Sequence, residues 1–387
     1  MDLSKEKTVS KLISLLADGK AGAPIIAEGT WGSFAPMLTA EISKALGRPI
    51  LYIAPHIDDA DNAADDITVF LKRTCRNLPA WEAQPEFADA TDEIGTERLK
   101  LAMEAEQLDD NAVISASVLA LCQPVPLPKA IEQRGLKINI GTVIEPELVI
   151  GWLDDNGFER VERVDMPGQF ACRGGIIDIY APITIEKRTQ SRPEAVRIEF
   201  FGDEIESIRS IDLDNQLSSG DLDNVTVIPP IGHQTIGKTE QFIHLLPKKT
   251  IIILEEPANI QETAEVFLSR VDNPQNLYNW ESIYKSISKF TQLHLNRFGA
   301  GTGDDIKLPV KSAQQYERKA GPIFDGHKAV LDELVDAALG GTKVYLYCEN
   351  DAESSRVNEI IREKHKRFLK IFICPSALSI TDSSSIR

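Results

Sequence analysis

The sequence lacks the features of a secreted or membrane-spanning protein. No apolar run approaches the roughly 20 residues that a membrane-spanning helix requires. The N-terminal stretch is amphipathic but has no signal-peptide core and no small-residue cleavage site. We therefore expect a cytoplasmic protein that has no membrane partner.

Cysteine and histidine are too few and too scattered to form a disulfide framework or a zinc site. The chain has five cysteines and six histidines, with no C-x-x-C pair and no zinc-ligand spacing. An odd, dispersed set of cysteines is typical of reduced thiols in a reducing compartment. The sequence therefore predicts no bound metal.

Basic residues are scarce relative to acidic ones. The chain carries 59 Asp and Glu against 42 Lys and Arg, which gives a net charge of −17. Tight binding of a polyanion draws on many lysines and arginines. The chain as a whole is therefore poorly equipped to bind nucleic acid, although a local basic patch is compatible with this balance.

A phosphate-binding loop is present in outline but lacks its chemistry. Residues 24–55 read as strand, tight loop, helix and strand, the layout around the motif G-x-x-x-x-G-K-[ST]. Counted from Gly29, Phe34 takes the last glycine position, Ala35 the lysine position and Pro36 the hydroxyl position. Ala35 cannot reach a phosphate, and Pro36 cannot ligate a magnesium ion. We expect Trp31 and Phe34 to fill the space of a nucleotide.

We interpret this segment as a degenerate phosphate loop that binds no nucleotide. Its residues are Gly29, Gly32, Ser33, Phe34, Ala35 and Pro36.

The pattern of elements predicts two α/β units and an inserted antiparallel domain. Residues 1–125 alternate apolar strands with helices, which predicts a parallel sheet, and residues 225–300 are expected to complete it. Residues 126–224 contain one helix and then strands joined by hairpin signals, typical of a small α+β domain. Residues 301–320 read as a linker. Residues 321–387 predict a small α/β domain, which we expect to be incomplete.

The inserted domain carries the most specific local pattern. Along residues 196–201 every second residue is apolar and faces the core, so Arg197 and Phe201 point outward. Along residues 169–173, Phe170 faces the core and Arg173 the opposite side. An exposed aromatic ring with arginines is the composition of a protein–protein hot spot. The alternative is that Phe201 tucks into the hairpin end and both arginines pair with nearby acids.

Other candidate sites have simpler interpretations. The paired carboxylates at 154–155 and 255–256 could do acid–base work, but without a cleft or a partner histidine we expect surface charges. Cys172 falls on the core-facing side, and buried cysteines are usually inert. His56 follows a strand at the carboxyl edge of the predicted parallel sheet, where ligands often bind. We interpret it as a structural loop histidine.

Two runs in the inserted domain resemble a known family. MPGQFACRGGIIDIYAP (166–182) is followed by VRIEFFGDEIESIRSID (196–212). Together they resemble the middle domain shared by the excinuclease component UvrB and the bacterial transcription-repair coupling factors (Mfd). Residues 24–55, 77–85 and 308–317 also fit, so the resemblance covers most of the chain.

Of the two relatives, the N-terminal region of the coupling factors is the better match. UvrB has an intact phosphate loop and a tyrosine-rich hairpin that grips DNA, whereas residues 82–99 here are short, acidic and without tyrosine. The coupling-factor module is a degenerate copy that lacks both. The resemblance implies an α/β fold: a degenerate helicase-like parallel sheet, an inserted antiparallel α+β domain and a second small α/β domain.

The resemblance also implies a role as a non-catalytic docking module. In coupling factors the middle domain binds the excinuclease component UvrA, which brings nucleotide excision repair to a stalled RNA polymerase. The family's contacts to that partner fall on Arg173, Arg197 and Phe201. The family's ATP, magnesium, DNA and RNA polymerase sites lie in translocase and polymerase-binding regions absent here. We therefore expect no catalytic residue and no cofactor.

Two alternatives stay open. One is an ATP-dependent repair protein similar to UvrB, which would use an unorthodox phosphate loop; Phe34, Ala35 and Pro36 argue against it. The other is a DNA-binding module of the same kind, against which the acid excess and the missing tyrosine-rich hairpin argue. Nucleotide affinity, or DNA affinity that falls steeply with salt, would favour them.

Overall fold

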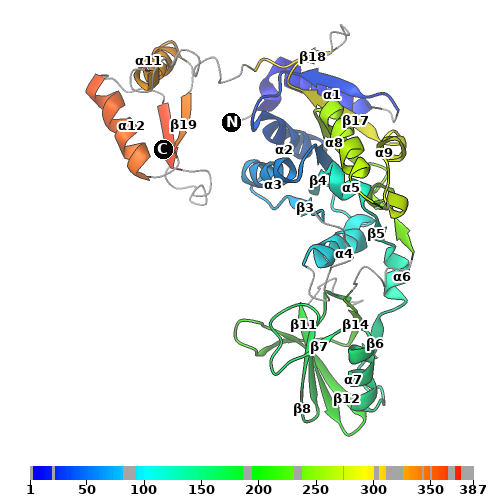
Figure 1. Cartoon of the computed structure of the whole chain (residues 1–387). Helices are drawn as coiled ribbons and strands as arrows, with labels where there is room; N and C mark the ends of the chain where they lie inside the picture. Colours follow the sequence, from blue (N-terminus) through cyan, green and yellow to red (C-terminus); the bar gives the residue numbers. More distant parts are fainter. Residues whose placement is uncertain are drawn as a thin grey trace.

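The fold combines a large parallel sheet with a separate, largely antiparallel domain (Figure 1). The structure is a computed structural model that describes residues 3–19, 22–81, 93–185, 194–230, 238–272, 274–299, 305–310, 326–341, 344–348, 351–364 and 371–375. The α/β fold class predicted from the sequence is confirmed. No helix in these ranges is long and apolar enough to cross a membrane.

The helices and strands have the following bounds. The helices are η1 (Leu3–Lys5), α1 (Lys7–Asp18), α2 (Phe34–Leu46), α3 (Ile57–Leu71), α4 (Glu93–Ala105), α5 (Val118–Cys122), α6 (Pro128–Glu132), α7 (Pro146–Asp155), η4 (Phe242–Leu245), α8 (Pro257–Ser269), η5 (Pro274–Asn276), α9 (Trp280–Ile287), α11 (Gly326–Leu339) and α12 (Asp351–Lys364). The strands are β1 (Ile25–Glu28), β2 (Ile50–Ala54), β3 (Arg76–Leu78), β4 (Val113–Ser117), β5 (Val125–Pro126), β6 (Leu136–Asn139), β7 (Glu159–Arg160), β8 (Gln169–Arg173), β9 (Ile176–Tyr180), β10 (Ile183–Ile185), β11 (Ala195–Phe201), β12 (Glu204–Ile211), β13 (Ser218–Asp221), β14 (Asn224–Ile228), β15 (Thr239–Glu240), β16 (Ile251–Glu255), β17 (Thr291–Asn296), β18 (Ile306–Lys307), β19 (Val344–Cys348) and β20 (Ile371–Pro375).

The parallel sheet draws its strands from both sides of the antiparallel domain in sequence. Its order is β18-β1-β17-β16-β2-β4-β3, and every pair in it is parallel. The interior strand β2 is buried along its whole length because helices cover both faces of the sheet. Leu51 and Ile53 pack toward α4, α5, α8 and α9, whereas Ile50 and Tyr52 pack toward α1, α2 and α3.

The antiparallel domain has its own core. A six-stranded sheet of order β13-β12-β11-β9-β8-β7 packs one face against α7 and a three-stranded sheet of order β10-β14-β6. Phe170 of β8 and Val196 of β11 are fully buried there, together with Leu153 of α7. Because alternate residues of a strand face opposite sides, the other set of side chains lies on the outer face.

The segment predicted as a linker, 301–320, contributes an edge strand to the large sheet. β18 pairs with β1, with Ile306 opposite Ala27, and the Leu308 N–H donates to the Glu28 carbonyl at 2.9 Å. A two-residue strand is too short to have a detectable alternation, which is why the sequence reads only as a linker. Residues 301–304 and 311–320 lie outside the described residues.

Within the last predicted unit, 321–387, the described elements are α11, β19, α12 and β20. β19 and β20 form a two-stranded parallel sheet.

Candidate protein-docking site

The hairpin of β11 and β12 sets the direction of the candidate side chains. β11 pairs with β12 on one side and with β9 on the other. The register of β11 with β12 shifts between Glu199 and Phe200, because Glu206 is an extra residue in β12 and forms a β-bulge. The bulge places Ile205 opposite Phe200 on the core side and Glu204 opposite Phe201 on the outer face.

The side chain of Phe201 stands in solvent. Phe201 is 78% exposed, at the end of β11 next to the turn Gly202-Asp203. Gly202 has a φ of 60°, a left-handed conformation that glycine adopts without steric cost and that closes the tight turn. Phe201 therefore does not tuck into the hairpin end.

Arg197 also lies on the outer face, but its guanidinium is engaged. Nε donates to Asp178 Oδ1 at 2.7 Å and Nη2 to Asp178 Oδ2 at 2.8 Å, a bidentate pair. Nη2 also approaches the carbonyl oxygen of Gln216 at 3.5 Å, and the Arg197 side chain is only 19% exposed. The hydrogen bonds to Asp178 raise the pKa of Arg197. For Arg197, the structure therefore agrees with the alternative in which the arginine pairs with a nearby acid.

Arg173 is the last residue of β8, and its side chain is exposed. Its Nη2 donates to the carbonyl oxygen of Glu162 at 2.6 Å. In the described part of the chain no carboxylate pairs with this guanidinium, so most of its N–H groups face solvent. The alternative in which both arginines pair with acids is therefore wrong for Arg173.

Arg209 on the outer face is paired with two acids of the same sheet. Arg209 Nη1 lies 3.5 Å from Glu199 Oε1 and Arg209 Nε 3.3 Å from Asp221 Oδ1. The end of the sheet that carries Phe201 and Arg173 therefore offers an aromatic ring and hydrogen-bond donors to a partner. Nothing in this group of side chains resembles a nucleophile with a base, so the arrangement can bind but has no evident catalytic chemistry.

The degenerate phosphate loop leads directly into α2. Gly29 has a φ of 93°, and its N–H donates to the Asn296 carbonyl at 2.9 Å, as does that of Thr30 at 3.2 Å. Gly32 is exposed with a φ of 55°, and Ser33 precedes α2 without a side-chain capping hydrogen bond.

The two positions that define a working phosphate loop are buried. Ala35 and Pro36 lie in the first turn of α2 and are part of the buried surface of that helix. From there neither presents a polar group to the loop, so the donor set does not fit a triphosphate with magnesium. Phe34 packs against the core beneath α1–α3, and the Trp31 ring meets that of Phe298 edge-on, with 5.0 Å between centroids.

Glu255 is not the surface charge that was expected. Its Oε2 accepts a hydrogen bond from the Tyr52 hydroxyl at 2.7 Å, and burial raises the pKa of Glu255. Tyr52 is fully buried in β2, so the Tyr52–Glu255 hydrogen bond is part of the interior of the protein. Burial likewise raises the pKa of the Cys172 thiol, which fits an unreactive cysteine. Residues 154–155 are exposed at the end of α7.

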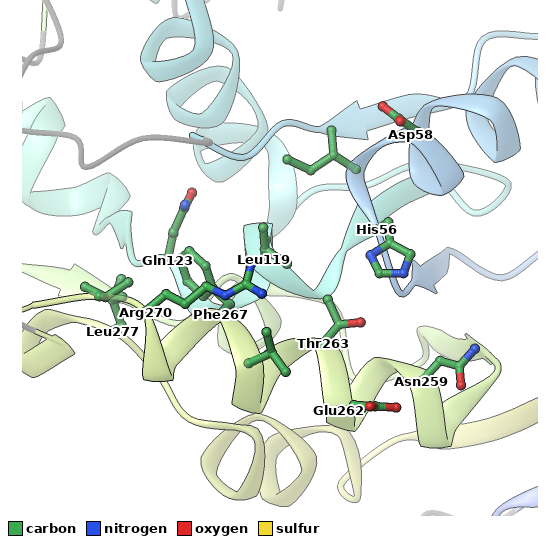
Figure 2. Close-up of a pocket in the computed structure, with 13 residues that line it drawn as sticks. His56, Asp58, Leu119, Gln123, Asn259, Glu262, Thr263, Phe267, Arg270 and Leu277 are labelled. Carbon is green, nitrogen blue, oxygen red and sulfur yellow. The ribbon is translucent and has the colours of Figure 1, made fainter.

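His56 lies on the rim of a cleft of about 880 Å³ (Figure 2). The cleft sits where β2 leads into α3 on one face of the sheet and β16 leads into α8 on the other. Such switch points are common ligand sites in parallel sheets. Figure 2 shows Thr263 of α8 directed toward His56, with Leu119 and Phe267 forming an apolar wall. His56 alone was identified from the sequence. Its neighbours Ile57 and Asp58 also line the cleft, and the remaining lining residues come from segments distant in the sequence.

Comparison with known proteins identifies the antiparallel domain. Residues 136–231, which begin at β6 and run past β14, match the family model described as the UvrB interaction domain. The antiparallel region is therefore similar to a UvrB interaction domain. It contains all three residues predicted to bind a partner.

The chain is similar to transcription-repair-coupling factors and to UvrB proteins. It is 32% identical over 203 residues to the coupling factor of Bacillus subtilis (52% of this chain, 16% of that protein). It is 24% identical over 290 residues to that of Escherichia coli (74% and 24%). The UvrABC system protein B of Methanosarcina mazei is 24% identical over 362 residues (86% and 51%).

These matches confirm the resemblance predicted from the sequence, to the UvrB-like region of a coupling factor. The chain spans less than two thirds of the length of each of these three relatives.

Sequence reasoning missed Asp178, the residue that holds Arg197. The alternation in the sequence could have placed Asp178 on the outer face, since Ile177 and Ile179 face the core. In the structure, the register of β9 with β11 then puts Asp178 opposite Arg197. Only the pairing of the two strands, which the sequence does not specify, brings the acid to the arginine.

Proposed function

We propose that this chain is a non-catalytic docking module that binds the excinuclease component UvrA. By resemblance to coupling factors, it would recruit UvrA to a stalled RNA polymerase in transcription-coupled nucleotide excision repair. RNA polymerase and DNA would be bound through other regions of the family. The match of residues 136–231 to the UvrB interaction domain supports this role.

The single observation that carries the proposal is the exposed ring of Phe201. A phenylalanine that is 78% exposed on a well-hydrogen-bonded hairpin presents apolar area at little conformational cost. Arg173 would supply charge-assisted hydrogen bonds beside it. Arg197 would act mainly by fixing β11 against β9 through Asp178.

The test is the affinity of UvrA for four forms of the chain, measured by calorimetry. These are the parent and the variants Arg173→Ala, Arg197→Ala and Phe201→Ala. Each substitution should weaken binding by about 2 kcal/mol, the usual scale for a hot spot. Leu217→Ala is the matched control, since Leu217 is also exposed in this domain but lies in the turn between β12 and β13. A triple alanine variant that binds as well as the parent would contradict the site.

The same proposal holds that the chain binds no nucleotide and catalyses no reaction. The burial of Ala35 and Pro36 supports it, because no side chain at those positions can contact phosphate or magnesium. A titration with ATP and magnesium, followed by calorimetry, should give no saturable heat. Saturable binding would favour the ATP-dependent alternative instead.

A further inference from the structure

A third segment of the chain joins the outer face beside Phe201. Residues 141–144, which connect β6 to α7, run antiparallel to the start of β12. The Gly141 N–H donates to the Ile205 carbonyl at 2.8 Å, and the Ile205 N–H donates to the Thr142 carbonyl at 2.9 Å. The Ile144 N–H donates to the Asp203 carbonyl at 2.7 Å. These three hydrogen bonds fix the segment to the hairpin tip, so it behaves as an extra short strand of the sheet.

The segment places Val143 in the same row as Phe201. Val143 is bridged to Glu204, and Glu204 is paired with Phe201 on its other side. Directly opposed residues of antiparallel strands share a face, so Val143, Glu204 and Phe201 point the same way. Val143 and Phe201 are two strand spacings apart, a distance of roughly 10 Å. Val143 is 74% exposed, nearly as much as Phe201.

The row has an unusual composition for a free surface. Two large apolar side chains stand in solvent on rigid backbone, with one carboxylate between them. In the described part of the chain, Glu204 has no ion-pair or hydrogen-bond partner for its side chain, whereas Glu199 and Asp178 on the same face are paired with arginines. Neighbouring exposed apolar groups on a fixed framework are typical of a protein-binding surface.

We propose that Val143 and Glu204 belong to the docking surface for UvrA. This inference rests on the proposed function. Val143 is a second apolar anchor beside Phe201. Glu204 accepts a hydrogen bond from a lysine or arginine of the partner. The complementary partner surface is an apolar depression that receives both side chains, with one basic residue at its centre. A wholly acidic or wholly apolar surface would leave the Glu204 carboxylate buried without a partner, which is costly.

The test is the affinity of UvrA for Val143→Ser, Glu204→Lys and Glu204→Gln, with the parent and Phe201→Ala beside them. Val143→Ser should weaken binding about tenfold, as expected for an apolar anchor. Glu204→Lys should weaken it more than Glu204→Gln, because the lysine would repel the basic residue of the partner. Glu204→Gln should also make the affinity less sensitive to salt between low and physiological ionic strength.

Matched controls separate these effects from changes in folding. Leu217→Ser removes an exposed apolar side chain elsewhere in the domain, and Asp155→Lys reverses an exposed charge at the end of α7. Both should bind like the parent. The hydrogen bonds of residues 141–144 to β12 are all between backbone groups, so thermal unfolding of Val143→Ser should match that of the parent.

The outcomes distinguish this inference from the proposed function. If Phe201→Ala loses binding while Val143→Ser and Glu204→Lys bind like the parent, the inference is overturned and the docking function stands. If the parent itself does not bind UvrA, both are overturned together.

Discussion

Arg197 shows that a residue on a binding face can also hold that face together. Its two hydrogen bonds to Asp178 join β11 to β9, and Asp178 is buried beneath it. Removing one partner of a buried ion pair leaves the other charge uncompensated, which is more destabilising than the pair is stabilising. A loss of binding in an Arg197 variant would therefore combine direct and structural effects.

We predict that Arg197→Ala destabilises the chain by about 2–3 kcal/mol, somewhat below the full cost for a buried pair because Arg197 is partly exposed. Arg173→Ala should change stability by less than about 0.5 kcal/mol, as is usual for an exposed side chain. Urea unfolding of the two variants measures both values. Equal stability of the two would show that the bidentate pair does not support the sheet.

At the scale of elements, the position of Phe201 depends on the close contact between the β8–β9 turn and β11. The Phe200 N–H donates to the Gly175 carbonyl at 2.8 Å, and a methyl group on Gly175 would come within 2.9 Å of the Phe200 carbonyl oxygen. Only glycine allows this approach. The turn thus fixes the residue that precedes the exposed ring.

We predict that Gly175→Ala costs about 1–3 kcal/mol of stability, because a backbone contact this short must be relieved by moving one strand. The same movement should weaken binding of UvrA. Gly151→Ala is the control: a methyl group there meets nothing within 4 Å, and alanine favours a helix, so stability should be unchanged or higher. Unfolding midpoints for both variants provide the measurement, and an unperturbed Gly175→Ala would refute the role of the turn.

Local periodicity predicted the strands of the antiparallel domain and the outward direction of Phe201, because both depend on residues close in sequence. It did not reveal β18 or the strand-like segment at Val143. Each is only a few residues long and is defined by pairing with a distant strand. Local periodicity also could not show that Glu255 is buried, because its partner Tyr52 lies in a strand about 200 residues earlier in the chain.

At the scale of the whole molecule, a buried histidine links stability to pH. Burial lowers the pKa of His294 in β17 from its ordinary value of 6.5 to about 4. The unfolded chain therefore binds a proton at this site more readily than the folded chain does. Stability should fall as the pH drops from about 6.5 toward 4, by up to about 3 kcal/mol from this residue.

We predict that His294→Gln reduces this loss of stability on acidification. Urea unfolding at a series of pH values between 4 and 7 provides the comparison. Superimposable profiles for the parent and His294→Gln would contradict the assignment.

The most direct test of the docking account is a photo-cross-link from the exposed ring itself. A photoreactive phenylalanine analogue at position 201 should cross-link to UvrA on illumination of the mixture. The same analogue at position 266, an exposed apolar position on α8 outside the antiparallel domain, should not. Efficient cross-linking from position 266 and none from position 201 would contradict the central claim that the outer face of the β11–β12 hairpin receives the partner.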